Sequence, residues 1–153
     1  MPGTAGRTLA DPAATEAFAR ELAVGLVPGN VICLWGDLGA GKTALARGVI
    51  TALGFTGEVP SPTFNLVLTY DTPRGLVWHF DLYRIDDPAE VLELGIEDAL
   101  ADGIVLIEWP DRLGAMLPDD RLDIELGISE DGLQRQVSVQ ARGTARNPVA
   151  GPC

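Results

Sequence analysis

The sequence predicts an α/β sandwich built on a mixed sheet, with a parallel core and an antiparallel hairpin. Three observations predict it. An apolar run at residues 31–35 leads through a glycine-rich loop into residues 43–53, where apolar side chains recur at helical spacing. Two runs of alternating apolar and polar character, 64–70 and 76–81, flank a connection of turn residues and indicate a hairpin. A continuous apolar run at 104–107 is typical of a buried parallel strand.

The segment before the first apolar run is expected to be a helix. Asp11 is suited to cap its N-terminus and Pro12 to occupy its first turn. Apolar residues follow at helical spacing as far as Leu26, so the helix is expected to end near residues 28–29. Residues 56–62 hold Gly57, Pro60 and Pro62 and are predicted to form a loop.

The second half of the chain continues to mix helices and strands. Short helices are expected at residues 88–94, 97–101 and 110–117, and strands at 122–128 and 133–139. A single domain is therefore predicted over residues 1–142. Residues 143–153 are predicted to be a flexible tail, because they are rich in proline and glycine and show no periodicity.

The glycine-rich loop is Gly36-Asp-Leu-Gly-Ala-Gly-Lys-Thr43, which fits the G-x-x-x-x-G-K-[ST] pattern of a phosphate-binding P-loop. Its glycines allow the backbone to form a nest of N–H donors at a helix N-terminus, where an anion is favoured. Lys42 is expected to reach the outer phosphates, and Thr43 to place its hydroxyl on Mg²⁺. The fold is thus predicted to be a P-loop NTPase sandwich that binds a nucleoside triphosphate with Mg²⁺.

Two acidic residues end apolar strands, where a P-loop enzyme places the group that holds its metal ion or orients water. Glu108 follows the run at 104–107, and Asp81 follows the run at 76–80. One is predicted to bind Mg²⁺ and the other to orient the attacking water. Ser61-Pro-Thr-Phe64 lies where nucleotide switches often place a hydroxyl, although an ordinary proline-rich turn is the alternative. His79, the only histidine, is expected to be structural.

Composition narrows the function classes. The chain of 153 residues has 22 acidic and 11 basic residues and a net charge of −11, so it is a poor independent binder of nucleic acid. Cys33 lies in an apolar run and Cys153 ends the chain, so no bridge and a reducing compartment are expected. No signal pattern or membrane-spanning run is visible, which predicts a cytoplasmic protein. The sequence holds no Asn-Lys-x-Asp element, so specificity for guanine nucleotides is not indicated.

Four segments, taken together, resemble a known family. They are Gly36 to Thr43, Val59-Pro-Ser-Pro-Thr-Phe64, His79-Phe-Asp-Leu-Tyr-Arg84 and Ile107-Glu-Trp-Pro110, in this order. The P-loop alone is shared by a very large superfamily, whereas the third and fourth segments are far more specific. The chain closely resembles the TsaE (YjeE) family of small bacterial ATPases over roughly residues 8–140.

This resemblance implies a helper in forming N6-threonylcarbamoyladenosine at position 37 of tRNAs. The implied partners are the transferase TsaD and its scaffold TsaB, with tRNA reached only through them, and the implied cofactors are ATP and Mg²⁺. Thr43 and Glu108 would bind Mg²⁺, Asp81 would act at the γ-phosphate or on the catalytic water, and Thr63 would be the switch hydroxyl. The implied nucleotide-binding residues are Thr15, near the nucleoside, and Gly39, Ala40, Gly41, Lys42 and Thr43 around the phosphates.

Two other functions are possible for a P-loop protein of this size. A small-molecule kinase should carry an arginine-rich lid, but the segment between the two acids holds only Arg84. A nucleotide-sensing adaptor without catalysis is disfavoured, because Lys42, Thr43, Asp81 and Glu108 are all present.

Overall fold

The computed structural model describes residues 4–37, 39–60 and 66–145. The strands of this part are β1 (Thr4–Leu9), β2 (Val31–Trp35), β3 (Val67–Thr72), β4 (Gly75–Asp81), β5 (Ile104–Glu108), β6 (Arg121–Ile128) and β7 (Arg135–Arg142). The helices are α1 (Pro12–Val24), α2 (Lys42–Ala52), α3 (Ala89–Leu92), α4 (Ile96–Asp102) and the 3₁₀ helix η1 (Pro110–Met116).

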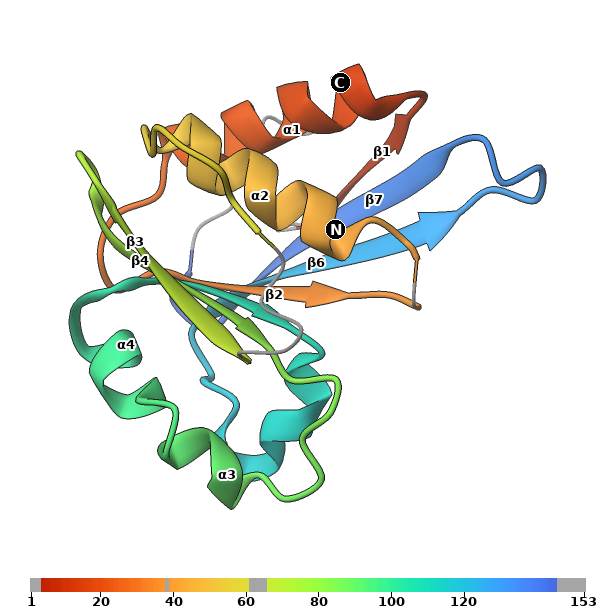
Figure 1. Ribbon diagram of the computed structural model, residues 1–153. Helices are drawn as coiled ribbons and strands as arrows, with labels where there is room; N and C mark the ends of the chain where they lie inside the picture. The colour runs from red at the N-terminus through yellow and green to blue at the C-terminus, as the bar shows by residue number, and fades with distance from the viewer. Residues whose placement is uncertain (1–3, 38, 61–65, 146–153) are drawn as a thin grey trace.

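The strands of the described residues form one mixed sheet of seven in the order β1-β7-β6-β2-β5-β4-β3 (Figure 1). The P-loop strand β2 lies between β5 and β6 and is parallel to both, and β4 is parallel to β5. The β3–β4 hairpin is antiparallel, with Tyr70 opposite Val77. The predicted parallel core with an antiparallel hairpin is therefore confirmed.

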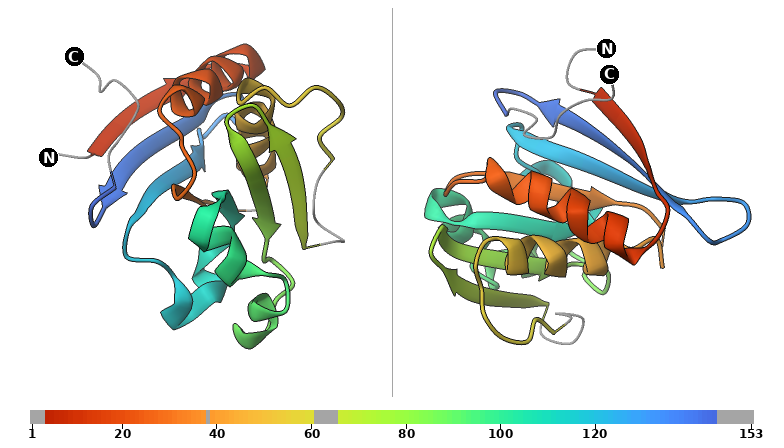
Figure 2. Two further views of the ribbon diagram at one scale, coloured as in Figure 1. Left: turned by 90° about the vertical axis from the view of Figure 1, so that its left-hand side faces the viewer. Right: turned by 90° about the horizontal axis from the view of Figure 1, so that it is seen from above.

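Each face of the sheet is covered by different helices (Figure 2). On one face α1 and α2 bury a core that includes Phe18, Leu45 and Leu106. On the other face α3, α4 and η1 cover a smaller core that includes Phe80 and Ile107. Burial on both faces explains why β5 is a continuous apolar run, as predicted.

Several predicted bounds differ from the structure. The α1 helix begins as predicted, with Asp11 Oδ1 accepting from the Ala14 N–H at 2.8 Å, but it ends at Val24 because Gly25 follows. The predicted strand at 64–70 begins only at Val67, since Leu66 has a positive φ of 66° that breaks the extended backbone; residues 61–65 lie outside the described part. The helix predicted at 110–117 is a short 3₁₀ helix kinked at Gly114.

The two outer strands beyond β6 also differ from expectation. β7 begins at Arg135 and not at Leu133, because the Leu133 N–H donates to Asp131 Oδ1 in the turn before it. β1 was not predicted, since it has little apolar periodicity; it is formed by antiparallel pairing with β7. β7 runs to Arg142 and a turn follows, so the division into a domain at 1–142 and a tail at 143–153 stays a prediction.

Gly36 is the point at which the P-loop passes closest to a neighbouring strand. A methyl group there would lie 2.5 Å from the Leu126 carbonyl oxygen, and the residue has a φ of +144°. Gly39 has a φ of +84°, but a methyl group there would meet nothing within 4 Å among the described residues. The loop therefore tolerates a side chain at Gly39 better than at Gly36.

Gly36→Ala is expected to lower the free energy of unfolding by about 2–4 kcal/mol, because backbone strain and overpacking add. Gly39→Ala, the matched control, is expected to cost only about 1 kcal/mol of conformational strain. Urea unfolding of the two variants compares them directly. Equal losses in the two variants would show that the approach to Leu126 does not limit this position.

The described part of the chain offers no helix of the length and apolar character that a membrane crossing requires. Cys33 is buried in β2, and burial raises its pKa to about 12, so it acts as a small apolar residue and not as a nucleophile.

Candidate functional site

The P-loop is positioned by the end of β2 and the start of α2. Gly41, with a φ of 103°, caps the helix, and the left-handed conformation turns the chain into α2 at Lys42. Leu38 lies outside the described residues. The N-terminus of α2, whose first N–H groups have no acceptor within the helix, therefore lies at the loop. This is the arrangement that favours a bound anion.

Glu108 lies at the floor of the site. It ends β5 with an exposed fraction of 2%, beside the end of β2. The hydroxyl of Thr43, in the first turn of α2, donates to Glu108 Oε1 at 2.7 Å. The other carboxylate oxygen, Oε2, lies 2.7 Å from His79 Nε2. The carboxylate is therefore held from both sides, by α2 and by β4.

Asp81 reaches the same place through the register of the sheet. It stands opposite Glu108 in the parallel β4–β5 pair, so their side chains share a face. Asp81 is 7% exposed, and its Oδ1 accepts from the Tyr83 N–H at 3.1 Å. The two acids that the sequence places 27 positions apart therefore lie side by side.

Lys42 is buried against the site in this structure. Its ammonium donates to the Gly36 carbonyl and, at 3.4 Å, to the Asp37 carbonyl, and it lies 3.6 Å from the centroid of the Trp109 ring. Burial lowers the pKa of Lys42, while the carboxylates of Glu108 and Asp81 oppose that shift. Burial is the larger effect, so the site disfavours the Lys42 charge overall, and the two nearby acids offset only part of this cost.

Trp109 turns the chain away from the site directly after Glu108. Its φ of 59° is left-handed, an uncommon conformation for a bulky residue. Its ring also contacts Tyr83, with centroids 4.9 Å apart. Strained residues of this kind cluster at ligand sites, and here the strain places the indole against Lys42.

These residues enclose a cavity of about 260 Å³ beside the P-loop. The side chains in its walls carry one ammonium, the two hydroxyls of Thr43 and Tyr83, and two carboxylates. The lining residues are Gly39, Gly41, Lys42, Thr43, Ala44, Asp81, Tyr83, Glu108 and Trp109.

A second cavity, of about 390 Å³, lies on the other side of the same loop. It shares Gly41 and Ala44 with the first, so the two meet at the start of α2. Thr15 of α1 lines it, and so do Leu133 from the β6–β7 turn and Arg135 at the start of β7. Its mixed apolar and polar walls are of the kind that hold a planar organic group.

The donor set fits a Mg²⁺ ion that is shared with phosphate. Oxygen ligands suit this ion, which usually keeps one or two protein oxygens together with water and phosphate oxygens. Thr43 and Glu108 offer such oxygens in contact with each other. Within residues 4–37, 39–60 and 66–145, no cluster of three or more His, Cys, Asp or Glu could form a complete protein cage.

The structure thus brings most of the predicted residues together. Lys42, Thr43, Asp81 and Glu108 line one cavity with Gly39 and Gly41, while Thr15 and Ala40 line the second. Thr63 lies outside the described residues, so its predicted switch role stays untested.

Sequence reasoning missed the contacts of four residues: His79, which lies behind the first cavity, and Trp109, Leu133 and Arg135, which line the two cavities. His79 was expected to be structural, and its burial agrees with that, but its contact with Glu108 was not predicted; its two-residue spacing from Asp81 on one strand was the available signal. Trp109 packs against the smaller core and its ring also lies on Lys42, a contact that the sequence did not indicate. Leu133 and Arg135 carried no sequence signal, because only the fold of β6 and β7 brings them to the P-loop.

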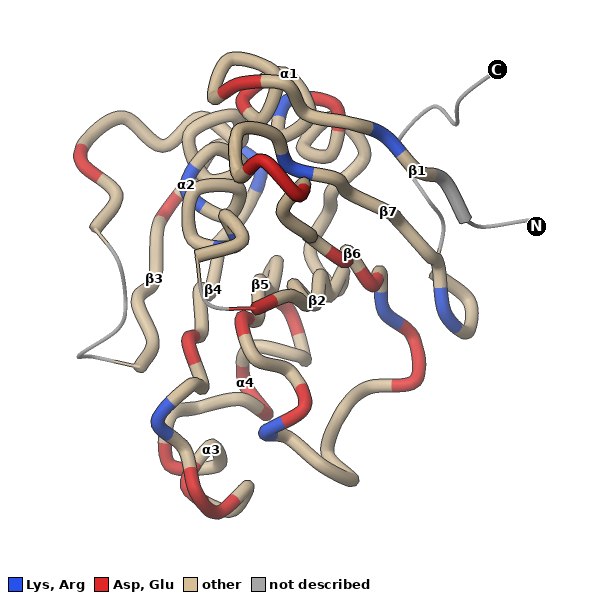
Figure 3. The backbone as a smooth tube through the Cα atoms, turned by 90° about the vertical axis from the view of Figure 1, so that its right-hand side faces the viewer, with Lys and Arg blue, Asp and Glu red and all other residues tan. Residues whose placement is uncertain are grey.

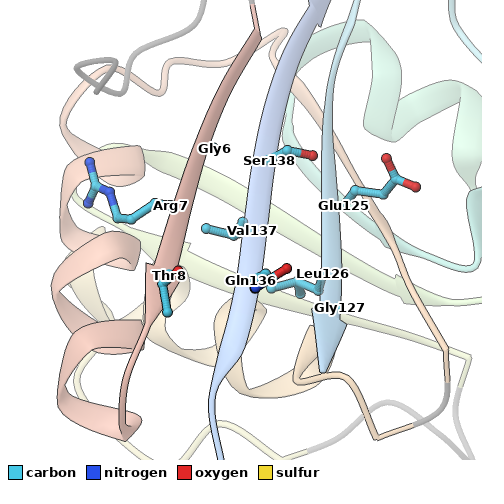
Figure 4. A pocket seen from close by; sticks show the side chains of 9 residues that line it. All are labelled: Gly6, Arg7, Thr8, Glu125, Leu126, Gly127, Gln136, Val137 and Ser138. Atoms are coloured by element: carbon cyan, nitrogen blue, oxygen red, sulfur yellow. The ribbon is translucent and has the colours of Figure 1, made fainter. Parts of the chain in front are cut away.

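A further hollow of about 520 Å³ lies away from the P-loop, on the open face of β1, β7 and β6 (Figure 4). Small and polar residues line it, including Thr8, Glu125, Gln136 and Ser138, whereas Arg7 points away toward α1 and pairs with Glu21. No cluster of candidate catalytic residues lies there.

Acidic residues are frequent in the part of the chain that carries α3 and α4, here called the acidic arm (Figure 3). Their negative charge disfavours direct contact with nucleic acid.

Comparison with known proteins places the chain in a family. The family model described as threonylcarbamoyl adenosine biosynthesis protein TsaE matches residues 9–137. A TsaE protein of Rickettsia bellii is 42% identical over 120 residues, which are 76% of this chain and 82% of the relative. The TsaE protein of Bacillus subtilis is 36% identical over 134 residues, or 87% of this chain and 83% of the relative.

A solved structure agrees with this. The crystal structure of YdiB from Bacillus subtilis matches with a TM-score of 0.78 and 30% identity, covering 92% of this chain and 86% of YdiB. Because the family model spans most of the chain and the relatives match most of their own length, this chain belongs to the TsaE family of tRNA threonylcarbamoyladenosine biosynthesis proteins.

Proposed function

We propose that this chain is a Mg²⁺-dependent ATPase that binds and hydrolyses ATP for the TsaB–TsaD complex during threonylcarbamoyladenosine formation. The observation that carries the proposal is the Thr43–Glu108 contact, made directly beneath a P-loop whose cavity also holds Lys42 and Asp81. A hydroxyl and a carboxylate at this point are the groups that hold Mg²⁺ in P-loop enzymes that hydrolyse nucleotides.

Each group then has a role that follows from its position. The N–H groups at the start of α2 and the Lys42 ammonium bind the phosphates and hold their negative charge. Thr43 and Glu108 would hold Mg²⁺, which when bound neutralises charge on the phosphate oxygens. Asp81 orients the attacking water, since it lies in the cavity beside Glu108. The second cavity, with Thr15 in its wall, takes the nucleoside.

Lys42 must change partners when phosphate arrives. Its ammonium is satisfied by loop carbonyls and the Trp109 ring in this structure, and a phosphate would replace these contacts with a charged acceptor. Asp81 and Glu108 need not move, because strand backbone holds both.

The action on tRNA is proposed to pass through protein partners. The net charge of −11 opposes direct binding to a polyanion, and the acidic arm adds to this. Partner binding also suits a slow ATPase, because a second protein can complete a site that the free chain leaves partly open.

The test is ATP turnover by the purified chain, alone and with TsaB and TsaD of the same organism. Turnover is expected to be weak alone and stimulated by the pair, and the pair is expected to retain the chain in a pull-down that responds to ATP. If ATP is consumed rapidly only when a small alcohol or acid is supplied as acceptor, the chain is a kinase and the proposal is wrong.

Thr43→Val tests the metal role, because valine keeps the shape of threonine and removes the hydroxyl. Mg²⁺-dependent turnover is expected to fall about tenfold or more, and by more than nucleotide affinity, since metal-contact groups contribute on this scale. Thr51→Val, at the exposed far end of α2, is the control and should leave turnover unchanged. Equal turnover in the Thr43→Val variant and the wild type would contradict the assignment.

A further inference from the structure

The carboxylate of Glu108 is tied at both oxygens, and only one of the two ties belongs to the P-loop. Thr43 Oγ1 donates to Oε1, and His79 Nε2 lies 2.7 Å from Oε2. His79 is fully buried, with an exposed fraction of 0%. A contact this short and this dry restricts the rotation of the carboxylate far more than a solvated one would.

The chemistry of the pair fixes which atom carries the hydrogen. An ionised carboxylate only accepts, so a hydrogen bond to it requires the hydrogen on Nε2. The other ring nitrogen, Nδ1, is buried and has no hydrogen-bond partner among the described residues. Glu108 is therefore the one polar group in the described part that holds this ring.

The position of His79 on β4 makes the contact possible. His79, Asp81 and Glu108 share one face of the β4–β5 pair, with His79 opposite Leu106 and Asp81 opposite Glu108. The ring thus lies behind the carboxylate, on the side away from the cavity, and it does not line that cavity. It cannot touch a nucleotide there and can act only through Glu108.

We propose that His79 is a positioning residue, which holds Glu108 Oε2 through an Nε2–H donor so that Oε1 is presented to Thr43 and to Mg²⁺. The metal half of this proposal rests on the proposed function; the hydrogen bond itself does not. Groups that hold a metal-binding carboxylate in this way typically contribute 10–100-fold in metal affinity or activity. If His79 only filled space, replacing it would lower the stability of the protein without weakening metal binding or activity.

The hydrogen bond is tested by NMR on protein labelled with ¹⁵N-histidine. His79 is the only histidine of the chain, so the imidazole signals need no assignment. The expected result is a hydrogen on Nε2 that exchanges slowly with water, both without nucleotide and with ADP. A bare Nε2 nitrogen in the nucleotide-free protein would overturn the proposal, whatever the ATPase activity.

The positioning role is tested with His79→Leu and His79→Gln. Leucine fills similar space without a donor, whereas the glutamine amide can restore an N–H near the position of Nε2. Electron paramagnetic resonance of Mn²⁺ titrated into the ADP complex gives the metal affinity, and fluorescent ADP in EDTA gives the metal-free nucleotide affinity.

His79→Leu is expected to weaken Mn²⁺ binding 10–100-fold, with metal-free nucleotide affinity unchanged, and His79→Gln to recover most of the loss. Wild-type Mn²⁺ affinity in His79→Leu, or equal losses in both variants, would overturn the positioning role. Failure of the wild type to bind nucleotide or Mn²⁺ would instead overturn the proposed function, and the NMR result would then still decide the hydrogen bond. If His79→Leu does not fold, the comparison of His79→Gln with wild type and the NMR measurement decide the question.

Discussion

Asp81→Asn is expected to lower ATP turnover by about 10²–10⁴-fold while ATP still binds, because a positioned base or water-orienting group contributes on this scale. Asparagine keeps the size of the side chain, and its carbonyl oxygen can still accept from the Tyr83 N–H. The turn after β4 should therefore survive, and the change removes charge and basicity in the cavity. The measurement is single-turnover hydrolysis together with nucleotide affinity.

The control for Asp81 is Asp86→Asn, which removes an exposed carboxylate from the loop that follows. Its turnover should match that of the wild type, since its charge is solvated and does not line the cavity. Unchanged turnover in Asp81→Asn would move the water-orienting role to another residue. A large loss of nucleotide affinity would show that Asp81 supports the ground state and not the reaction.

Lys42→Met is expected to weaken ATP binding by about thirtyfold or more. Removing one partner of a buried charge pair costs about 2–5 kcal/mol, and each 1.4 kcal/mol is a factor of ten in affinity. Methionine keeps an apolar stem against the Trp109 ring, so the variant tests the ammonium more than the packing. Calorimetric titration with ATP and Mg²⁺ gives the affinity.

Arg47→Met is the matched control, because Arg47 is exposed on the same helix and does not line the phosphate cavity. Its affinity for ATP should stay within a few-fold of the wild type. The Lys42→Met variant also leaves Glu108 and Asp81 without the neighbouring cation, so its melting temperature is measured in parallel. Equal affinity in Lys42→Met and wild type would remove the phosphate role from Lys42.

The central sheet could be predicted because local patterns dominate there. β2, β4 and β5 are apolar runs or alternating runs bounded by turn residues, and the structure has them within about a residue of the predicted bounds. Bounds were predicted less well where one residue decided the end, as Gly25 does for α1 and Leu66 for the hairpin. β1 was missed because its stability comes from pairing with β7, a contact between the two ends of the described chain.

The site divides in the same way. The P-loop could be predicted, since its glycines, Lys42 and Thr43 are consecutive and their spacing is fixed by the backbone they form. Asp81 and Glu108 could be proposed from their strand ends. The hydrogen-bond partner of each group could not be predicted. The contact between His79 and Glu108, for example, joins residues 29 positions apart and depends on the register between their two strands.

The sequence by itself therefore determined the fold class, the phosphate-binding loop and the two acidic strand ends, all of which depend on short-range periodicity and consecutive residues. Only the tertiary structure decided that Glu108 is held by Thr43 and His79, that Lys42 lies on Trp109, and that the β6–β7 turn walls the second cavity. The physical reason is that strand order and register bring distant residues together, and no local pattern in a single chain encodes which strands become neighbours.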